Sequence, residues 1–459
     1  MTEVLLTAPE GETIPVVVVA EGVLEGLSDF ELGLAAAADF KGRNGQVLVV
    51  PAPDGATAKV LFGVGDPAKA DAMAFRALPA KLAVGDYRIE GVLAGLDPAR
   101  IALAFALGSY GFDRYRKKRE RHARLIAADG VDVVELREIA LACALARDMV
   151  NTPANDMGPL QIETIAREIA ERHGASISVI TGDALLAENY PSIHAVGRAA
   201  DPTRAPRMIE LRWGEADWPL VAIVGKGVVF DTGGLDIKPS AGMRLMKKDM
   251  GGAAHALALG RMLMAAKLPI RVAVLVPTVE NAISGDAMRP GDVLDTRKGL
   301  TVEVGNTDAE GRLILSDALT RAGELDPILT IDLATLTGAA RIALGPQVIP
   351  FYTDDDVLAA DIAAASKAVG DPLWRMPLWP GYEEALDCDI ADLKNDPDGW
   401  AQAGSVTAAL FLKRFAPASG SWVHLDIFAW NPKGAPGRPV GGEAQAIRAL
   451  YAMLKSRFA

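Results

Sequence analysis

The sequence has few of the residues from which metal and nucleophile sites are most often built. It contains two cysteines and five histidines in 459 residues. Cys143 and Cys388 lie far apart in the sequence, so no disulfide framework or cysteine-rich zinc site can be built from them, and a reducing compartment fits best. The histidines are scattered, and neither a His-Glu-x-x-His sequence nor a Gly-x-Ser-x-Gly elbow is present. A histidine-based zinc site and a serine triad therefore have no support.

Long apolar runs and an excess of basic charge are also missing. No stretch reaches the roughly 20 uninterrupted apolar residues of a membrane span, and the N-terminus carries acidic residues where a secretory signal carries basic ones. We therefore expect a cytoplasmic protein with no membrane partner. Its 59 acidic and 47 basic residues give a formal charge of −12. The one basic run, at 114–124, is expected to be a surface loop, so nucleic acid is not an expected partner.

Short β-branched runs alternate with longer helical patterns, which predicts an α/β fold. We expect a small N-terminal α/β domain at 1–135 and a larger C-terminal catalytic α/β domain at 136–459, with a central mixed sheet flanked by helices. In the first domain the predicted strands are 15–20, 46–51 and 59–62, and the predicted helices are 28–38, 75–82 and 99–107. Ser28 and Glu31 form a possible capping box for the first of these helices, and Pro79 weakens the second.

The second domain is expected to begin with a segment at 132–150 in which one strand runs into a long helix. Further helices are predicted at 159–173, 252–266 and 312–324. The predicted strands are 177–181, 206–212, 220–225, 270–276 and 328–333. Several of these strands are almost continuously apolar, which is typical of a sheet covered on both faces.

Charged side chains interrupt two apolar parts of this second domain. An uncompensated carboxylate in such a place costs several kcal/mol or takes up a proton, so something cationic must meet it. Two divalent metal ions would balance four carboxylates, and oxygen-rich two-metal sites can activate water for hydrolysis. The charged residues are Lys226, Asp231, Lys238, Asp249, Asp308 and Glu310.

The acidic residues also have ordinary structural interpretations. Asp308, Glu310 and Arg312 alternate, so an extended backbone would project all three to one side, where the guanidinium could hold a small anion. The alternative is a helix N-terminal signal, which carries at least equal weight when these residues are taken alone. Asp231 alone fits a strand-terminating turn, and Asp249 alone fits a helix cap. Their joint occurrence is what favours a site.

The two lysines are the less common members of this set. Lys226 lies inside an apolar strand pair, where it must be paired, neutralised or directed outward. As a neutral amine beside a dication it could be a metal ligand. Lys238 would keep its charge and stabilise a developing oxyanion. Ordinary salt bridges are the alternative for both.

Three segments carry a resemblance to a known family. They are 224–239, 246–252 and 306–313, the last reading Asn-Thr-Asp-Ala-Glu-Gly-Arg-Leu. Together with shorter matches at 151–155, 334–338, 424–427 and 437–440, these segments resemble the signature of the leucyl aminopeptidase family of two-metal exopeptidases. The resemblance covers roughly the last two thirds of the chain.

The resemblance implies a role for each residue. Asp231 and Glu310 would bridge two metals, Asp308 would complete one site, and Lys226 with Asp249 would complete the other. Lys238 would polarise the scissile carbonyl, and Arg312 would position a bicarbonate-like anion that acts as general base. The residues implied to form the pocket for the first side chain of the substrate are Met246, Thr335 and Gly338.

The resemblance also implies cofactors and partners. Zinc is the usual ion, with manganese or magnesium tolerated at the looser site, and members are commonly homohexamers. The expected activity is release of an N-terminal residue, apolar by preference, from short peptides by a water that bridges two divalent cations. Two alternatives remain at this point. One is a two-metal phosphoesterase, and the other is a hexameric DNA-binding architectural protein that keeps a passenger peptidase site.

Overall fold

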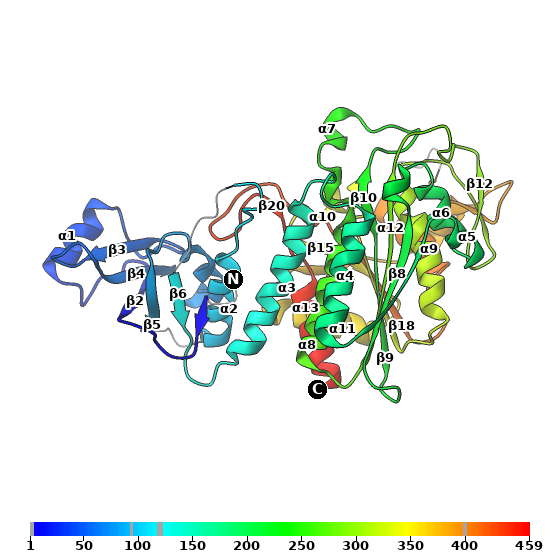
Figure 1. The fold of residues 1–459 in the computed structure, drawn as a ribbon. Coiled ribbons are helices and arrows are strands. Elements are labelled where there is room, and N and C mark those ends of the chain that lie inside the picture. Colours follow the sequence, from blue (N-terminus) through cyan, green and yellow to red (C-terminus); the bar gives the residue numbers. More distant parts are fainter. Residues whose placement is uncertain (1–3, 92–94, 117–122, 398–401) are drawn as a thin grey trace. The chain divides into compact units, whose positions relative to one another are not determined.

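The computed structural model describes residues 4–91, 95–116, 123–397 and 402–459 (Figure 1). The chain forms two compact units. One comprises 1–144 together with 433–440, and the other comprises 145–432 together with 441–459. Part of the basic run predicted to be a surface loop, 117–122, lies outside the described residues. No helix in the described ranges has both the length and the apolar composition needed to cross a membrane.

The first unit is built on a six-stranded sheet in the order β1-β6-β5-β2-β4-β3, in which only β3 and β4 pair antiparallel. All three strands predicted here are confirmed. The strands are β1 (Leu5–Leu6), β2 (Thr13–Ala20), β3 (Val47–Pro51), β4 (Thr57–Gly65), β5 (Gly85–Glu90) and β6 (Ala123–Ile126). The helices are α1 (Asp29–Ala37), α2 (Pro98–Gly108) and the short 3₁₀ segments η1 (Pro67–Lys69) and η2 (Ala72–Ala77).

Helix predictions in this unit were confirmed in two places and wrong in one. The capping box of α1 is present, with Ser28 Oγ accepting from Glu31 N and Glu31 Oε2 accepting from Ser28 N at 2.9 Å. Helix α2 matches the expected span. The helix predicted at 75–82 is instead η2, which ends before Pro79. Proline lacks an N–H and disfavours helical geometry in the residue before it, so the segment stays a short 3₁₀ turn.

The strand predicted at the start of 132–150 is also wrong. The segment is helical throughout, as α3 (Val133–Asn151), and the nearby strand β6 ends earlier. Asp132 Oδ1 accepts a hydrogen bond from Glu135 N at 3.0 Å, which satisfies a free donor of the first helical turn. The β-branched residues near this point suggested a strand, and the helix start signal outweighed them.

The second unit contains a mixed nine-stranded sheet in the order β16-β15-β18-β14-β9-β11-β8-β7, with β10 also pairing with β11. Every strand and helix predicted between 159 and 333 is present, with small shifts at the ends. The strands are β7 (Ser176–Thr181), β8 (Arg207–Trp213), β9 (Leu220–Gly225), β10 (Gly227–Asp231), β11 (Arg271–Asn281), β14 (Leu329–Ala334), β15 (Ile349–Tyr352), β16 (Leu373–Arg375) and β18 (Ser421–Asp426).

Helices cover both faces of this sheet, as expected for an α/β domain (Figure 1). One group consists of α4 (Pro159–His173), α8 (Gly251–Ala266), α11 (Asp356–Val369) and α13 (Ile447–Phe458). The other consists of α6 (Pro191–Gly197), α9 (Glu310–Gly323) and α12 (Gly404–Lys413). The shorter helical segments are η3 (Pro202–Arg204), α5 (Ala184–Ala187), α7 (Ser240–Met243), η4 (Met246–Met250), α10 (Gly338–Leu344) and η5 (Pro380–Leu386). Short strands form two small sheets. One contains β12 (Val293–Asp295), β13 (Thr301–Glu303) and β17 (Leu393–Lys394), and the other contains β19 (Trp430–Asn431) and β20 (Gly441–Gly442).

The carboxyl ends of the central strands hold one backbone segment in place. Lys226 lies between β9 and β10, where its N–H donates to Leu333 O at 3.0 Å and its carbonyl accepts from Ala253 N at 2.7 Å. This close approach requires glycine at the start of α8, since a Cβ on Gly252 would lie 2.1 Å from Leu333 O. Ligand sites in α/β proteins collect at this end of the strands.

Candidate metal centre

The structure brings all six charged residues singled out from the sequence into one cluster. They come from separate places along the chain. Lys226 lies between β9 and β10, Asp231 ends β10, Lys238 lies in the loop that follows, Asp249 lies in η4, Asp308 lies in the turn before α9, and Glu310 is the first residue of α9.

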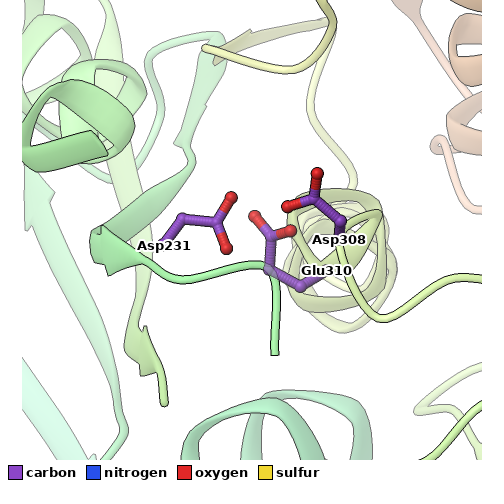
Figure 2. Close-up of side chains that lie close together, drawn as sticks. All are labelled: Asp231, Asp308 and Glu310. Atoms are coloured by element: carbon purple, nitrogen blue, oxygen red, sulfur yellow. The ribbon is translucent and has the colours of Figure 1, made fainter. Parts of the chain in front are cut away.

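Three of the carboxylates point at one another. Asp231, Asp308 and Glu310 each offer an oxygen, and these oxygens lie within 4.8 Å of one another (Figure 2). Asp231 and Glu310 are almost fully buried, with 2% and 1% of their surface exposed, whereas Asp308 is partly exposed. Such a group of buried carboxylates is unfavourable without positive charge.

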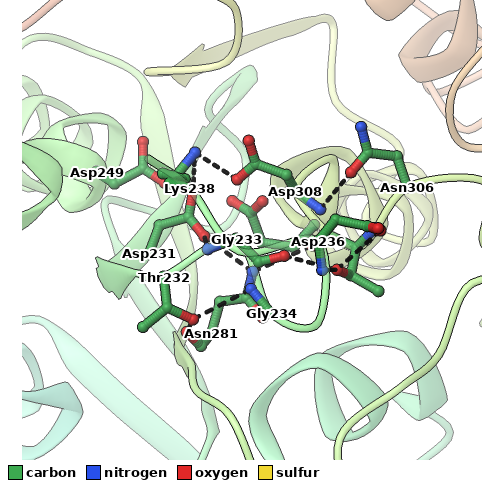
Figure 3. Close-up of polar contacts among 12 residues, drawn as sticks. Asp231, Thr232, Gly233, Gly234, Asp236, Lys238, Asp249, Asn281, Asn306 and Asp308 are labelled. Atoms are coloured by element: carbon green, nitrogen blue, oxygen red, sulfur yellow. Dashed lines mark hydrogen bonds and ion pairs between the residues drawn. The ribbon is translucent and has the colours of Figure 1, made fainter. Parts of the chain in front are cut away.

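Each lysine bridges two of the acids. Lys226 Nζ lies 2.8 Å from Asp249 Oδ2 and 2.9 Å from Glu310 Oε1. Lys238 Nζ lies 2.8 Å from Asp231 Oδ2 and also contacts Asp308 Oδ1 (Figure 3). The salt bridges considered as an alternative are therefore present. Lys248 Nζ is a third ammonium group, 3.7 Å from Asp249 Oδ1, although burial lowers its pKa to about 8. Three ammonium groups still offset only three of the four carboxylates.

Three oxygens of the cluster have only an ammonium group as partner, because Lys226 Nζ contacts Asp249 Oδ2 and Glu310 Oε1 and Lys238 Nζ contacts Asp308 Oδ1. Asp249 Oδ2, Asp308 Oδ1 and Glu310 Oε1 are buried atoms that make no hydrogen bond of good geometry within the described part of the chain. Buried polar atoms normally have hydrogen-bond partners or bind an ion. An excess of negative charge, on carboxylate oxygens that have no hydrogen bond of good geometry beyond these ion pairs, fits divalent cations.

The pKa values of two carboxyl groups in the cluster are raised, as is expected when carboxylates lie close together and are buried. Burial, followed by the charge of Asp231, raises the pKa of Glu310 to about 8. The same two causes raise the pKa of Asp308 to about 6. Burial opposes the charged form of Lys226, but Asp249 and Glu310 outweigh it, so the pKa of this ammonium is raised. Lys226 must therefore release a proton if it is to bind a metal as a neutral amine.

These shifts predict how the metal-free protein responds to pH. Glu310 binds a proton up to about pH 8 when folded but only to about pH 4.5 when unfolded, so the folded state holds more protons between these values. The free energy of unfolding should then fall as pH rises, by up to about 1.4 kcal/mol per pH unit for each such proton. The raised pKa of Lys226 lies above this window and does not contribute. Denaturant unfolding of metal-stripped protein between pH 5 and 8 measures this slope.

The metal-loaded protein is the reference for that measurement. Burial also raises the pKa of Asp317, to about 7, and this carboxyl adds a slope of the same sign with or without metal. Bound cations keep Asp308 and Glu310 ionised, so the loaded protein should show a smaller slope, and metal affinity should rise with pH. Equal slopes for the two forms would contradict the assignment of these carboxyls to a metal site.

A layer of hydrogen bonds fixes Asp231. Its Oδ1 accepts from Gly233 N at 2.9 Å and from Asn281 Nδ2 at 2.8 Å (Figure 3). Gly233 has φ +89°, and a Cβ there would lie 2.5 Å from Asp236 O, so the turn requires glycine. Thr307 Oγ1 donates to Gly233 O at 2.6 Å and ties this turn to the segment before α9.

Sequence reasoning missed Asn281 and Thr307 as members of this layer. The sequence position of each residue could have identified it. Asn281 is the polar last residue of the apolar strand β11, which pairs with β10 so that Asn281 stands opposite Asp231. Thr307 lies inside the motif that carries Asp308. Neighbouring strand ends meet at one edge of the sheet, so a polar residue there is a candidate partner.

The backbone assumed for Asp308, Glu310 and Arg312 is wrong. Helix α9 already begins at Glu310, so Glu310 and Arg312 are two residues apart on a helix and point to different sides. Asp308 lies in a turn in which its N–H donates to Asn306 Oδ1 at 2.8 Å. Arg312 is buried, and its Nη1 donates to Asn395 O. Arg312 lies near enough to the cluster to be influenced by the charge of Glu310, but it forms no ion pair with the cluster among the described residues.

The helix N-terminal interpretation is confirmed only in that Glu310 lies in the first turn of α9, and the cap interpretations are not supported. The N-cap residue of α9 is Ala309 and that of α8 is Met250, and neither makes a side-chain cap hydrogen bond. Asp249 instead accepts from the Thr335 hydroxyl at 2.8 Å and faces Lys226. These acids are therefore placed toward one another and not toward free helix N–H groups.

The three residues expected to line the substrate side-chain pocket lie at different depths. Thr335 is buried, and its carbonyl accepts from Lys226 Nζ at 3.3 Å. Met246 is half-buried and opens η4, the segment that carries Asp249. Gly338 is exposed and opens α10.

Sequence models of one family match nearly the whole chain. The catalytic domain of the cytosol aminopeptidase family matches residues 144–451, and the N-terminal domain of the M17 aminopeptidases matches residues 24–128. The chain belongs to the cytosol aminopeptidase family. The resemblance to leucyl aminopeptidases seen in the sequence is confirmed.

Individual proteins are similar to this chain over most of their length. A probable cytosol aminopeptidase of Syntrophotalea carbinolica is 38% identical over 449 residues, which is 91% of this chain and 89% of that protein. The cytosol aminopeptidase of Coxiella burnetii, solved by crystallography, has a TM-score of 0.93 at 42% identity and covers 99% of both chains. The bottromycin maturation enzyme BotP, solved in complex with Mn, has a TM-score of 0.88 at 35% identity and covers 97% of this chain and 99% of its own.

Membership in the cytosol aminopeptidase family defines the activity. The chain is a metal-dependent aminopeptidase and therefore a hydrolase. The phosphoesterase and DNA-binding alternatives are not supported by these relatives.

Proposed function

We propose that the acidic cluster holds two divalent cations and that the chain uses them to release N-terminal residues from peptides. Asp231 and Glu310 would be shared between the cations, Asp308 would bind one, and Lys226 with Asp249 would bind the other. The observation that carries this proposal is the convergence of four carboxylates whose negative charge exceeds the positive charge of the three lysines paired with them.

The cations, when bound, would supply a water activated near neutral pH and would polarise the scissile carbonyl. The remaining work falls to side chains of the chain itself. Lys238 has a protonated ammonium held against Asp231 and Asp308, and its raised pKa keeps that charge in the pH range of the reaction. It is placed to stabilise the oxyanion that forms when the carbonyl is attacked.

Arg312 is the second catalytic candidate. It is buried beside the cluster, and its Nε has no hydrogen-bond partner within the described ranges. A buried guanidinium with a free donor can bind an oxyanion, which supports the proposed bicarbonate. The bicarbonate would accept the proton of the attacking water as general base.

The substrate and its surroundings follow from the same proposal. A peptide would present its free α-amine and first carbonyl to the cations and its first side chain to Met246, Thr335 and Gly338. We propose residues 136–459 as the catalytic domain and 1–135 as an accessory domain, a homohexameric assembly and a cytoplasmic location. The relatives named as cytosol aminopeptidases support that location.

Metal analysis combined with turnover tests this proposal. Chelated protein should be inactive toward aminoacyl anilides, and addition of zinc or manganese should restore turnover as two ions bind per chain. The Mn complex of BotP supports manganese as one of the ions to test. Phosphoester hydrolysis under the same conditions is the comparison. Turnover that survives chelation, or restored hydrolysis of phosphoesters alone, would contradict the proposal.

A further inference from the structure

A guanidinium group lies beside one of the residues expected to receive the substrate side chain. Arg341 is on α10, one helical turn after Gly338. A Cβ built on Gly338 would lie 3.6 Å from Arg341 Nη2, so the guanidinium is next to that residue. Arg341 Cζ lies 4.5 Å from the centre of the Phe428 ring, which supports one face of the guanidinium.

This arginine has no anionic partner of its own. Within the described part of the chain it has no carboxylate at ion-pair distance and makes no hydrogen bond through its side chain. It is half-buried, so part of the group remains accessible. A planar guanidinium supported on an aromatic ring, with its N–H donors free, is suited to bind a carboxylate through two parallel hydrogen bonds.

The surroundings of Phe428 are otherwise positive. Lys248 Nζ lies 5.6 Å from the centre of the same ring, and its nearest carboxylate oxygen, Asp249 Oδ1, is 3.7 Å away. Asp249 belongs to the acidic cluster and also faces Lys226. Arg341 is therefore the cation at this ring that no acid of the cluster neutralises.

The position of Arg341 is linked to the reacting centre through a short stretch of chain. Thr335 precedes α10 and contacts both Asp249 and Lys226. Asp426 Oδ1 accepts from Leu336 N at 3.0 Å and from Thr337 N at 3.1 Å, which fixes the turn between Thr335 and α10. Gly338 and Arg341 are thus held at a defined distance from the cluster.

We propose that Arg341 determines substrate specificity by binding the side-chain carboxylate of an N-terminal glutamate or aspartate. This rests on the proposed function, which places the first side chain near Gly338. An acidic side chain would reach the guanidinium and offset its charge, whereas an N-terminal lysine would meet like charge from Arg341. An apolar side chain would neither pair with the charge of the guanidinium nor be repelled by it.

The test measures kcat/KM of the metal-loaded enzyme on anilides of glutamate, leucine and lysine. The wild-type enzyme should prefer glutamate over lysine by at least about tenfold, the size that charge-assisted hydrogen bonds supply. Arg341→Gln should lower kcat/KM for the glutamate substrate about tenfold or more and change the leucine substrate by less than about threefold. Arg88→Gln, which removes an exposed arginine of the first unit, should change neither.

Arg341→Lys keeps the charge but loses the planar pair of donors, so it should retain part of the glutamate preference. This variant also decides the question if Arg341→Gln fails to fold. An unchanged ratio of glutamate to leucine turnover in both variants would overturn the role of Arg341 while leaving the aminopeptidase intact. Absence of turnover on all three anilides after metal loading would instead contradict the proposed function.

Discussion

Asp308→Asn and Glu310→Gln are each expected to abolish turnover, with a loss on the order of 10³-fold or more, while the protein remains folded. Each replacement removes a negative charge and one anionic oxygen from a cluster whose oxygens lie within 4.8 Å of one another. The amide is a weaker ligand for a divalent cation than a carboxylate. Metal content and kcat/KM at several metal concentrations measure the effect.

The same substitutions should not damage the metal-free fold. Glu310 is buried among like charges, and burial with Asp231 already favours its neutral form, so a neutral glutamine of similar size relieves repulsion. We expect the unfolding temperature of the metal-free variants to equal or exceed that of the wild type. Asp356→Asn is the matched control, because Asp356 also lies in a first helical turn but is exposed. Full activity in Asp308→Asn or Glu310→Gln would remove the metal assignment.

The strands of the sheet and the residues of the charged cluster could be predicted from the sequence for the same physical reason. Strands such as β9 are buried on both faces, so their apolar runs are continuous and their ends are marked by the first charged residue. Lys226 and Asp231 are such residues. Since the carboxyl ends of neighbouring strands meet at one edge, charges at several strand ends predict a single site.

Two backbone predictions were wrong because the sequence did not show where a helix begins. An alternating pattern from Asp308 to Arg312 is compatible with both an extended chain and the first turn of a helix, and only packing decides between them. Helix α9 begins at Glu310, so one acid of the motif is on the helix and the other precedes it. The segment at 132–150 shows the same ambiguity, where a capping interaction at Asp132 extended a helix over residues with strand preference.

Features that join distant segments could not be predicted from a single sequence. Arg341 lies over the ring of Phe428, which belongs to a loop after β18, and neither residue lies in a pattern that links the two. Asn281 reaches Asp231 only because β11 pairs with β10 in one register. Local patterns determine which residues are buried and charged, and the register of the sheet determines which of them meet.

Lys238→Ala is expected to lower kcat about 10² to 10³-fold at saturating metal, with KM changed by less than about threefold. Its ammonium group is the one cation of the cluster that contacts both Asp231 and Asp308, and its side chain is 14% exposed, compared with 4% for Lys226. An incoming peptide can therefore reach it, and its positive charge is most useful when negative charge develops on the carbonyl oxygen.

A structural role for Lys238 makes a different prediction. If the ammonium only offset Asp231 and Asp308, bound cations would replace it, and the alanine variant would reach wild-type kcat once metal is saturating. Lys238→Arg keeps the charge but moves it, so partial activity is expected there. Lys69→Ala, at an exposed lysine of the first unit, should leave kcat unchanged. An unchanged kcat in Lys238→Ala at saturating metal would take Lys238 out of the chemical step, because an interaction that stabilises the ground state and the transition state equally does not change kcat.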